Sequence, residues 1–207
     1  CLNGSVSAVG IRRIREYRAD LDLRAVPDRM SQEEWDLHKD KLVFALVDRM
    51  LDHHSPVRHL EDERQASIVQ NAFLHFAGER YTLLAFVVMP SHHHWLFVPD
   101  EAWSLLAVQR SVRPDGRRRT AREIISHSIR SYTATMCNRV RGASGPYWQT
   151  ETFDRFARDE AEMYRIIHYI ERNPVKAGLL ERPEDWLYSS ARIRSLAGTK
   201  PGAPILP

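Results

Sequence analysis

The stretch FVVMPSHHHWLFVPD, residues 86–100, places three consecutive histidines between two apolar runs. Residues 81–89 are almost continuously apolar and rich in β-forming side chains, which predicts a strand covered on both faces. Pro90 and Ser91 then form a turn signal, and residues 92–98 fit a second strand. The stretch therefore predicts a β-hairpin or near-hairpin in the core of the fold.

The three histidines divide between the two faces of the second strand. Side chains alternate along a strand, so His92 and His94 project together while His93 points the other way. Two adjacent imidazoles can bind a metal ion as neutral ligands, and histidine is mostly neutral at pH 7. The chain has ten histidines in 207 residues, so a His-x-His pair also arises readily by chance. A further ligand is needed before the pair indicates a metal site.

Helical patterns surround the predicted hairpin. Ser31 followed by Glu34 is a capping-box sequence, in which each side chain satisfies the backbone amide of the other residue. The clearest apolar periodicity precedes Pro174, where Met163, Ile166, Ile167 and Ile170 recur at helical spacing. The expected helices span residues 5–25, 31–53, 63–77, 120–140 and 160–173, and residues 145–156 are interpreted as irregular or partly strand.

The helix expected over residues 160–173 also carries polar groups beside its apolar stripe. Tyr169 and Asn173 are four residues apart, so they lie on the same side of that helix. A phenol and a carboxamide in this arrangement can face a groove and take part in chemistry. Alternatively, Tyr169 is an edge residue of an amphipathic helix and Asn173 is a stop before Pro174. Tyr132 is a second candidate nucleophile, but Met136 stands where a polar ligand would follow it.

Basic residues are distributed unevenly along a chain whose formal net charge is only +3. This balance permits nucleic acid as a partner without specifying it. Arginines gather between residues 110 and 122, and such a run is either a solvated loop or a surface that follows a phosphate backbone. Trp148 either stacks on an unpaired base or packs in the core. The candidate DNA-binding residues are Arg117, Arg118, Arg119, Arg122, Arg130, Arg139, Arg141 and Trp148.

Cysteine content and hydropathy bear on where the protein resides. The two cysteines, Cys1 and Cys137, cannot build a disulfide framework or a four-cysteine zinc site within one chain, which fits a reducing cytoplasm. No apolar run approaches the length that crosses a bilayer, and the start of the chain lacks a secretory pattern. We therefore expect a cytoplasmic protein without a membrane partner.

Four segments resemble, in order, the motifs of the REP-associated tyrosine transposases, which are single-tyrosine members of the HUH endonuclease superfamily. The segments are MPSHHHWLF (89–97), YWQTETFDRFARD (147–159), YIERNPVKAGLLERPEDW (169–186) and Ser189-Ser190. The long motif that begins at Tyr169 carries most of the weight. The resemblance implies an α+β fold, in which helices pack against a ferredoxin-like antiparallel sheet.

The resemblance also implies a chemistry and a partner. It assigns His92, His94 and Asn173 as ligands of Mg²⁺ or Mn²⁺, and Tyr169 as the nucleophile that forms a 5′-phosphotyrosine link with DNA. The implied substrate is single-stranded DNA bearing hairpins such as repetitive extragenic palindromes. Ser91 departs from the family pattern, which has asparagine there, and His93 stands at a position that is usually bulky and apolar.

Two other functional classes stay open at this point. One is a domesticated relative that binds DNA hairpins without cleaving them, and the other is a hydrolytic metalloenzyme acting on a small phosphate ester. The expected organisation is an N-terminal helical segment (1–62), a transposase-like core (63–197) and a flexible tail (198–207). Family members begin with a strand in the middle of the sheet, and this strand is expected to be missing because the sequence begins just after it. Monomer and homodimer are both compatible with the sequence.

Overall fold

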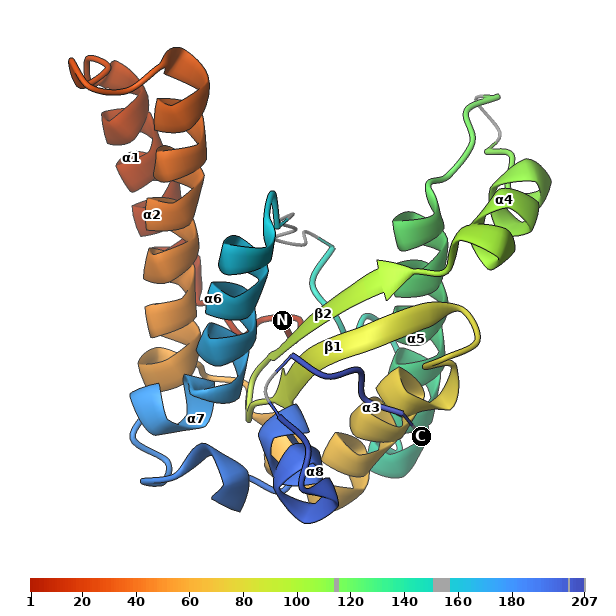
Figure 1. Ribbon diagram of the computed structural model, residues 1–207. Coiled ribbons are helices and arrows are strands. Elements are labelled where there is room, and N and C mark those ends of the chain that lie inside the picture. Colours follow the sequence, from red (N-terminus) through yellow and green to blue (C-terminus); the bar gives the residue numbers. More distant parts are fainter. Residues whose placement is uncertain (114–115, 151–156, 201, 207) are drawn as a thin grey trace.

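The computed structural model describes residues 1–113, 116–150, 157–200 and 202–206. It confirms the α+β fold, with helices on both sides of a two-stranded antiparallel sheet in the described part of the chain (Figure 1). Strands β1 (Tyr81–Val88) and β2 (His93–Pro99) pair with Phe86 opposite Trp95 and Val87 opposite His94. The predicted hairpin is thus confirmed, and β1 is buried along nearly its whole length.

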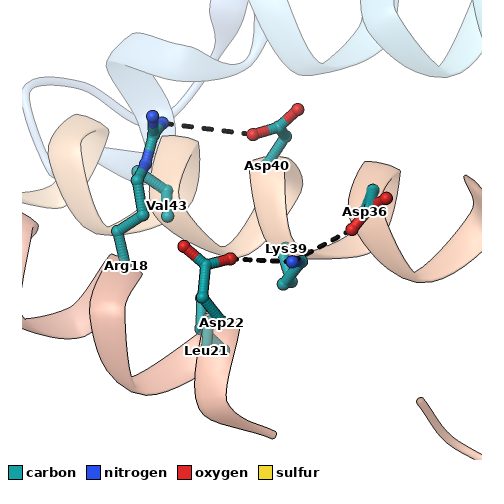
Figure 2. Close-up of a pocket in the computed structure, with 7 residues that line it drawn as sticks. All are labelled: Arg18, Leu21, Asp22, Asp36, Lys39, Asp40 and Val43. Carbon is teal, nitrogen blue, oxygen red and sulfur yellow. Dashed lines mark hydrogen bonds and ion pairs between the residues drawn. The ribbon is translucent and has the colours of Figure 1, made fainter. Parts of the chain in front are cut away.

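Helices α1 (Ala8–Leu23) and α2 (Gln32–His54) form a helical hairpin that rises beside α6 in Figure 1. The predicted capping box opens α2: the amide of Glu34 donates to Ser31 Oγ at 3.1 Å, and the amide of Ser31 donates to Glu34 Oε2 at 2.7 Å. Lys39 joins the two helices through an ion pair of 2.7 Å with Asp22 (Figure 2). The hairpin buries a small apolar cluster of its own, which consists of Val6, Leu21, Val43, Val47 and Leu51.

The largest apolar cluster lies between β1 and the helices α3 (Glu63–His75) and α5 (Ala121–Arg141). Phe73 of α3 stacks on Trp95 of β2, with ring centroids 4.8 Å apart. Gly142 ends α5 in the left-handed conformation, φ +61°, which glycine adopts without steric cost. Both helices match the ranges expected from the sequence.

Helix α6 (Glu160–Glu171) packs on the other side of β1. Ile167 and Ile170 contact a cluster that includes Val87 and Met89, as the apolar periodicity of this segment predicts. The chain does not leave the helical path at Pro174, because a short helix α7 (Asn173–Lys176) begins there. Proline is tolerated in the first turn of a helix, where its missing N–H has no partner to lose.

Helices α4 (Glu101–Arg110) and α8 (Ser190–Ala197) complete the described part of the chain, together with short 3-10 turns at His59–Glu61 and Pro183–Asp185. The tail contains an ordered contact, although the sequence predicts a loose segment from residue 198. Ile205 is 3% exposed and its amide donates to the carbonyl of Leu83 at 2.8 Å. No described helix combines the length and apolar character that crossing a membrane requires.

Candidate metal and nucleophile site

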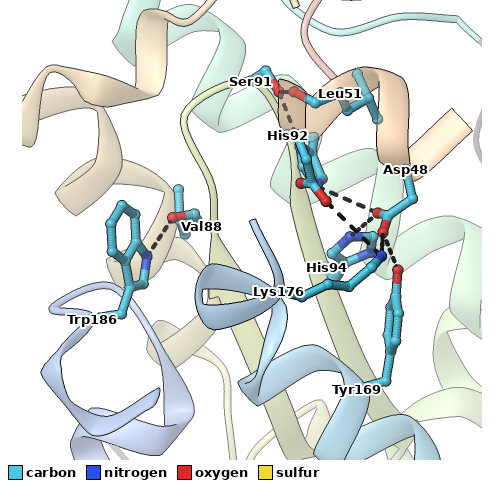
Figure 3. A network of polar contacts seen from close by, with 10 residues as sticks. Asp48, Leu51, Val88, Ser91, His92, His94, Tyr169, Lys176 and Trp186 are labelled. Carbon is cyan, nitrogen blue, oxygen red and sulfur yellow. Dashed lines mark hydrogen bonds and ion pairs between the residues drawn. The ribbon is translucent and has the colours of Figure 1, made fainter. Parts of the chain in front are cut away.

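Three segments far apart in the sequence meet at the start of β2. Helix α2 contributes Asp48, the turn into β2 contributes His92, β2 itself contributes His94, and helix α6 contributes Tyr169 (Figure 3). The rings of His92 and His94 are 4.9 Å apart between centroids. The predicted pairing of these two imidazoles on one side of the strand is therefore observed.

His93 points to the opposite side of the sheet, as alternation along the strand requires. Its ring packs 5.2 Å from Phe73 and 4.8 Å from Trp148, between centroids. Burial lowers the pKa of His93 well below its usual value, so this side chain is neutral. The middle histidine thus takes the packing role of a bulky apolar residue.

Asp48 lies at the centre of the site, and its two carboxylate oxygens face different groups. Oδ1 is 3.0 Å from His94 Nε2 and 3.7 Å from His92 Nε2. Oδ2 accepts hydrogen bonds from Lys176 Nζ at 2.6 Å and from the Tyr169 hydroxyl. One carboxylate therefore bridges the histidine pair and the phenol.

The surroundings of Asp48 keep it charged although its side chain is only 1% exposed. Burial opposes the charge, but hydrogen bonds from His94, Lys176 and Tyr169 outweigh burial and hold the pKa of Asp48 well below its usual range. Asp48, His92 and His94 together offer three ligand atoms within 4.8 Å of one another. Such a set of one carboxylate and two imidazoles is able to bind a divalent metal ion.

Ser91 determines which nitrogen of His92 faces this centre. Ser91 Oγ is 3.0 Å from the carbonyl oxygen of Leu51, which only accepts, and 3.0 Å from His92 Nδ1. The hydroxyl proton must point at Leu51, so the serine oxygen accepts the proton carried by Nδ1 of His92. Nε2 of His92 is then left with a free lone pair directed toward Asp48, as a metal ligand requires.

Replacement of Ser91 by alanine tests this orientation. Removing a hydrogen bond that supports a ligating histidine typically weakens metal binding by about 10–100-fold. We expect Ser91→Ala to raise the dissociation constant for Mn²⁺ by about that factor in calorimetric titration, and Ser131→Ala, on the exposed side of α5, to leave it unchanged. Equal affinity in Ser91→Ala and the unmodified protein would contradict the assigned tautomer.

The surroundings of Tyr169 favour its protonated form. Burial, the charge of Asp48 and the hydrogen bond to Asp48 all raise the pKa of the phenol above its usual value. Its ring contacts Phe44 of α2 and His94, with centroids 5.9 and 5.8 Å apart. A cation that draws charge from Asp48 would lower this pKa and favour the reactive phenolate.

Several buried polar atoms at the site have no hydrogen-bond partner among the described residues. They include Nε2 of His92 and both amide atoms of Asn173, a residue that is 0% exposed. Buried polar groups are almost always paired, and an unpaired one signals a missing water or ion. These atoms fit a metal ion and its bound water. The sequence predicts one helix that carries both Tyr169 and Asn173, but the structure ends α6 at Glu171 and places Asn173 at the start of α7.

The predicted DNA-binding residues do not form one patch. Arg117, Arg118, Arg119 and Arg122 lie at or before the start of α5, whereas Arg139 and Arg141 lie in its last turn. A helix of 21 residues is about 30 Å long, so the two groups are well separated. The guanidinium of Arg130 donates to the carbonyl of Gln149.

Two aromatic residues considered from the sequence lie away from the histidines. Trp148 is 7% exposed, and its indole donates to Thr133 Oγ1 at 2.9 Å. It therefore packs in the core, which was the alternative to stacking on an unpaired base. Tyr132 is 54% exposed on α5, and no interaction found among the described residues joins it to His92 or His94. Of these two tyrosines, Tyr169 is the one that lies beside the histidine pair.

Comparison with known proteins gives one solved structure with a similar fold. It is a REP-associated tyrosine transposase bound to a REP hairpin, with a TM-score of 0.48 and 19% sequence identity. The match covers 70% of this chain and 75% of that chain. The sequence motifs resemble the same family. No protein-family model matches the sequence, and no curated protein matches it.

The sequence interpretation did not identify Asp48 or Lys176 as site residues. Asp48 accepts a hydrogen bond from the Tyr169 hydroxyl, and Lys176 donates one to Asp48. Lys176 Nζ lies 5.1 Å above the Tyr169 ring, and its side chain is 47% exposed. One signal for Asp48 was present in the sequence: an acidic residue stands directly after Val47, between Phe44 and Leu51, on the apolar side of a helix. A buried carboxylate needs a partner, and here the partners come from β2, α6 and α7.

Proposed function

We propose that this protein is a metal-dependent DNA strand transferase that cleaves single-stranded DNA beside hairpins and becomes linked to it through Tyr169. The observation that carries the proposal is that Asp48, which groups with His92 and His94, also accepts a hydrogen bond from the Tyr169 hydroxyl. Motif resemblance makes REP-type hairpins the first substrate to test. A phenol beside a metal site suits phosphoryl transfer better than hydrolysis, because it forms a covalent ester that preserves the energy for rejoining.

The proposed step is a transesterification in which atoms balance without another reactant. The Tyr169 oxygen attacks the phosphorus, forming an O–P bond, while the bond from phosphorus to the 3′-oxygen breaks. The phenolic proton is lost and the departing 3′-oxygen gains one, which leaves a free 3′-hydroxyl and a 5′-phosphotyrosine. Asp48 positions the phenol through the hydrogen bond at its Oδ2, and the reverse reaction rejoins the strand.

The proposed ligands of the ion are Asp48 Oδ1, Nε2 of His92 and Nε2 of His94, with the Asn173 amide as a further oxygen donor. A bound Mg²⁺ or Mn²⁺ would polarise the phosphoryl group and offset the negative charge of the transition state. His94 Nε2 donates to Asp48 here, so it must give up that proton to become a ligand. Lys176, half exposed beside Asp48, is placed to hold a phosphate oxygen.

Metal removal tests the proposal as a whole. A labelled single-stranded DNA hairpin incubated with the protein and Mn²⁺ should run on a denaturing gel as a slower band of covalent protein–DNA adduct. We expect chelation with EDTA to abolish the band and added Mn²⁺ to restore it, because the buried phenol is not ionised without the cation. Hairpin binding without an adduct in any divalent metal would instead identify a non-cleaving DNA-binding protein.

We further propose that the segment between α4 and α5 contacts the DNA backbone. Within it, residues 111–113 pair with residues 117–119: Arg119 donates its amide to Ser111, and Val112 pairs with Arg118. Arg117 and Arg118 are exposed there. In Figure 1, α4 extends from the body of the fold, which suits a contact with a long ligand near this segment.

Salt dependence distinguishes backbone contacts from general folding effects. Each lost phosphate contact should reduce the slope of log affinity against log salt by about 1. We expect Arg117→Ala combined with Arg118→Ala to weaken hairpin binding and to reduce this slope by about 2. The matched pair Arg12→Ala and Arg13→Ala, exposed on α1, should leave the slope unchanged, and an unaltered slope in the first pair would remove the proposed contact.

A further inference from the structure

A second carboxylate of α2 is buried beside the proposed metal site. Asp52 follows Asp48 by four residues, so both side chains lie on one side of the helix. The side chain of Asp52 is 1% exposed. Neither of its oxygens accepts a hydrogen bond from any described residue.

Such a carboxylate is costly unless something else pairs with it. Burial and the charge of Asp48 raise the pKa of Asp52 to about 6. Lys176 Nζ is 4.0 Å from its Oδ2, beyond hydrogen-bond distance, and is held by Asp48 at 2.6 Å. The lysine thus gives Asp52 only partial compensation.

One oxygen of Asp52 lies next to one of the three proposed ligands. Asp52 Oδ1 is 3.8 Å from His92 Nε2, which lies 3.7 Å from Asp48 Oδ1. Ligands at about 2.0–2.2 Å from a tetrahedral ion are separated by about 3.3–3.6 Å. The separations of Asp52 and Asp48 from His92 are close to this range, but Asp52 lies outside the group of ligand atoms that are all within 4.8 Å of one another. Its carboxylate therefore has to shift toward the other three groups to bind the same ion.

We propose that Asp52 is a further metal ligand, so that α2 supplies two carboxylates to an ion also held by His92 and His94. This inference rests on the proposed metal site. Two carboxylates neutralise a divalent cation, and the two imidazole nitrogens favour a transition metal such as Mn²⁺ over Mg²⁺, which prefers an all-oxygen environment. Lys176, on the outer oxygens of both acids, remains available for the DNA phosphate.

The proposal gives the N-terminal helical hairpin a defined role. Helix α2 belongs to the α1–α2 hairpin, whose apolar cluster is largely its own, yet its last turns carry both acids. An ion bound between α2 and β2 therefore connects this hairpin to the sheet. Metal binding should then stabilise the folded protein, because the complete ligand set exists only in the folded state.

The decisive experiment uses the full chain without DNA, with Mn²⁺ as the probe. Calorimetry gives the dissociation constant, and thermal unfolding is recorded with and without Mn²⁺. We expect Asp52→Asn to raise the dissociation constant at least tenfold and to lose most of the increase in Tm caused by Mn²⁺. Asp40→Asn, at an exposed position of the same helix, should behave as the unmodified protein does.

The metal-free Tm separates a ligand from a structural carboxylate. If Asp52 is a metal ligand, it is a buried charge without adequate partners whenever the metal is absent. Removing that charge in Asp52→Asn should therefore leave the metal-free Tm equal or higher. A lower metal-free Tm with unchanged Mn²⁺ affinity would overturn the role of Asp52 and leave the proposed function intact. Failure of the unmodified protein to bind Mn²⁺ would remove the proposed metal site itself. Should Asp52→Asn not fold, Asp52→Ser replaces it with the same expectations.

Discussion

Replacement of Tyr169 by phenylalanine is expected to abolish the covalent protein–DNA adduct completely. The variant lacks the only atom proposed to attack the phosphorus, and no other group in the mechanism replaces it. The phenyl ring keeps its packing against Phe44 and His94. The fold should therefore persist, with a loss of about 1 kcal/mol for the hydrogen bond to Asp48.

The controls for this experiment come from the same chain. Tyr132→Phe and Tyr164→Phe remove exposed phenols, 54% and 45% exposed, and each should form the adduct at the rate of the unmodified protein. Binding of the labelled hairpin, measured without chelator, should be similar in all four proteins. An adduct that survives in Tyr169→Phe, or that disappears in Tyr132→Phe, would show that the nucleophile has been assigned to the wrong residue.

Replacement of Arg194 by leucine is expected to destabilise the fold by about 3–5 kcal/mol, because it leaves a buried carboxylate without its cation. Arg194 is 4% exposed, and its guanidinium donates to Glu171 of α6, to the carbonyl of Leu84 in β1 and to the carbonyl of Ala203 at 2.8 Å. One side chain thus connects α8 with α6, β1 and the tail. For a chain of this size the loss corresponds to a fall in Tm of roughly 6–20 °C.

A second variant distinguishes loss of the ion pair from loss of packing. Combining Glu171→Leu with Arg194→Leu removes both buried charges, and the double variant should recover part of the stability lost in Arg194→Leu. Arg192→Leu, on the same helix and partly exposed, should change the free energy of unfolding by less than about 1 kcal/mol. A loss of that small size in Arg194→Leu would show that the buried ion pair does not stabilise the fold.

The elements around the site were predictable where the pattern is local. The apolar run before Pro90 predicts β1, and the recurrence of Ile166, Ile167 and Ile170 predicts α6, since each pattern is read within one element. Alternation in β2 correctly places His92 and His94 on one side and His93 on the other. Helix α4 was not predicted, because its apolar residues are not confined to one side of the helix and none of them is buried.

The remaining parts of the site depend on contacts between distant segments. Asp48 and Tyr169 are 121 residues apart, and Asp48 and Lys176 are 128 apart, so no local pattern joins them. The same holds for Ile205, whose ordered place depends on pairing with Leu83 of β1. Packing of α2 against the start of β2, rather than any motif, brings the carboxylates to the histidines.

The most direct test of the central claim is the identity of the residue that carries DNA after reaction with Mn²⁺. Trypsin cleaves after arginine, so Tyr169 falls in the peptide IIHYIER, residues 166–172, and Tyr132 in SYTATMCNR, residues 131–139. We predict that mass spectrometry of the digested adduct finds a nucleotide joined through phosphate to Tyr169 in the first peptide. Attachment to the second peptide, or DNA cleaved without any modified peptide, would contradict the proposed chemistry.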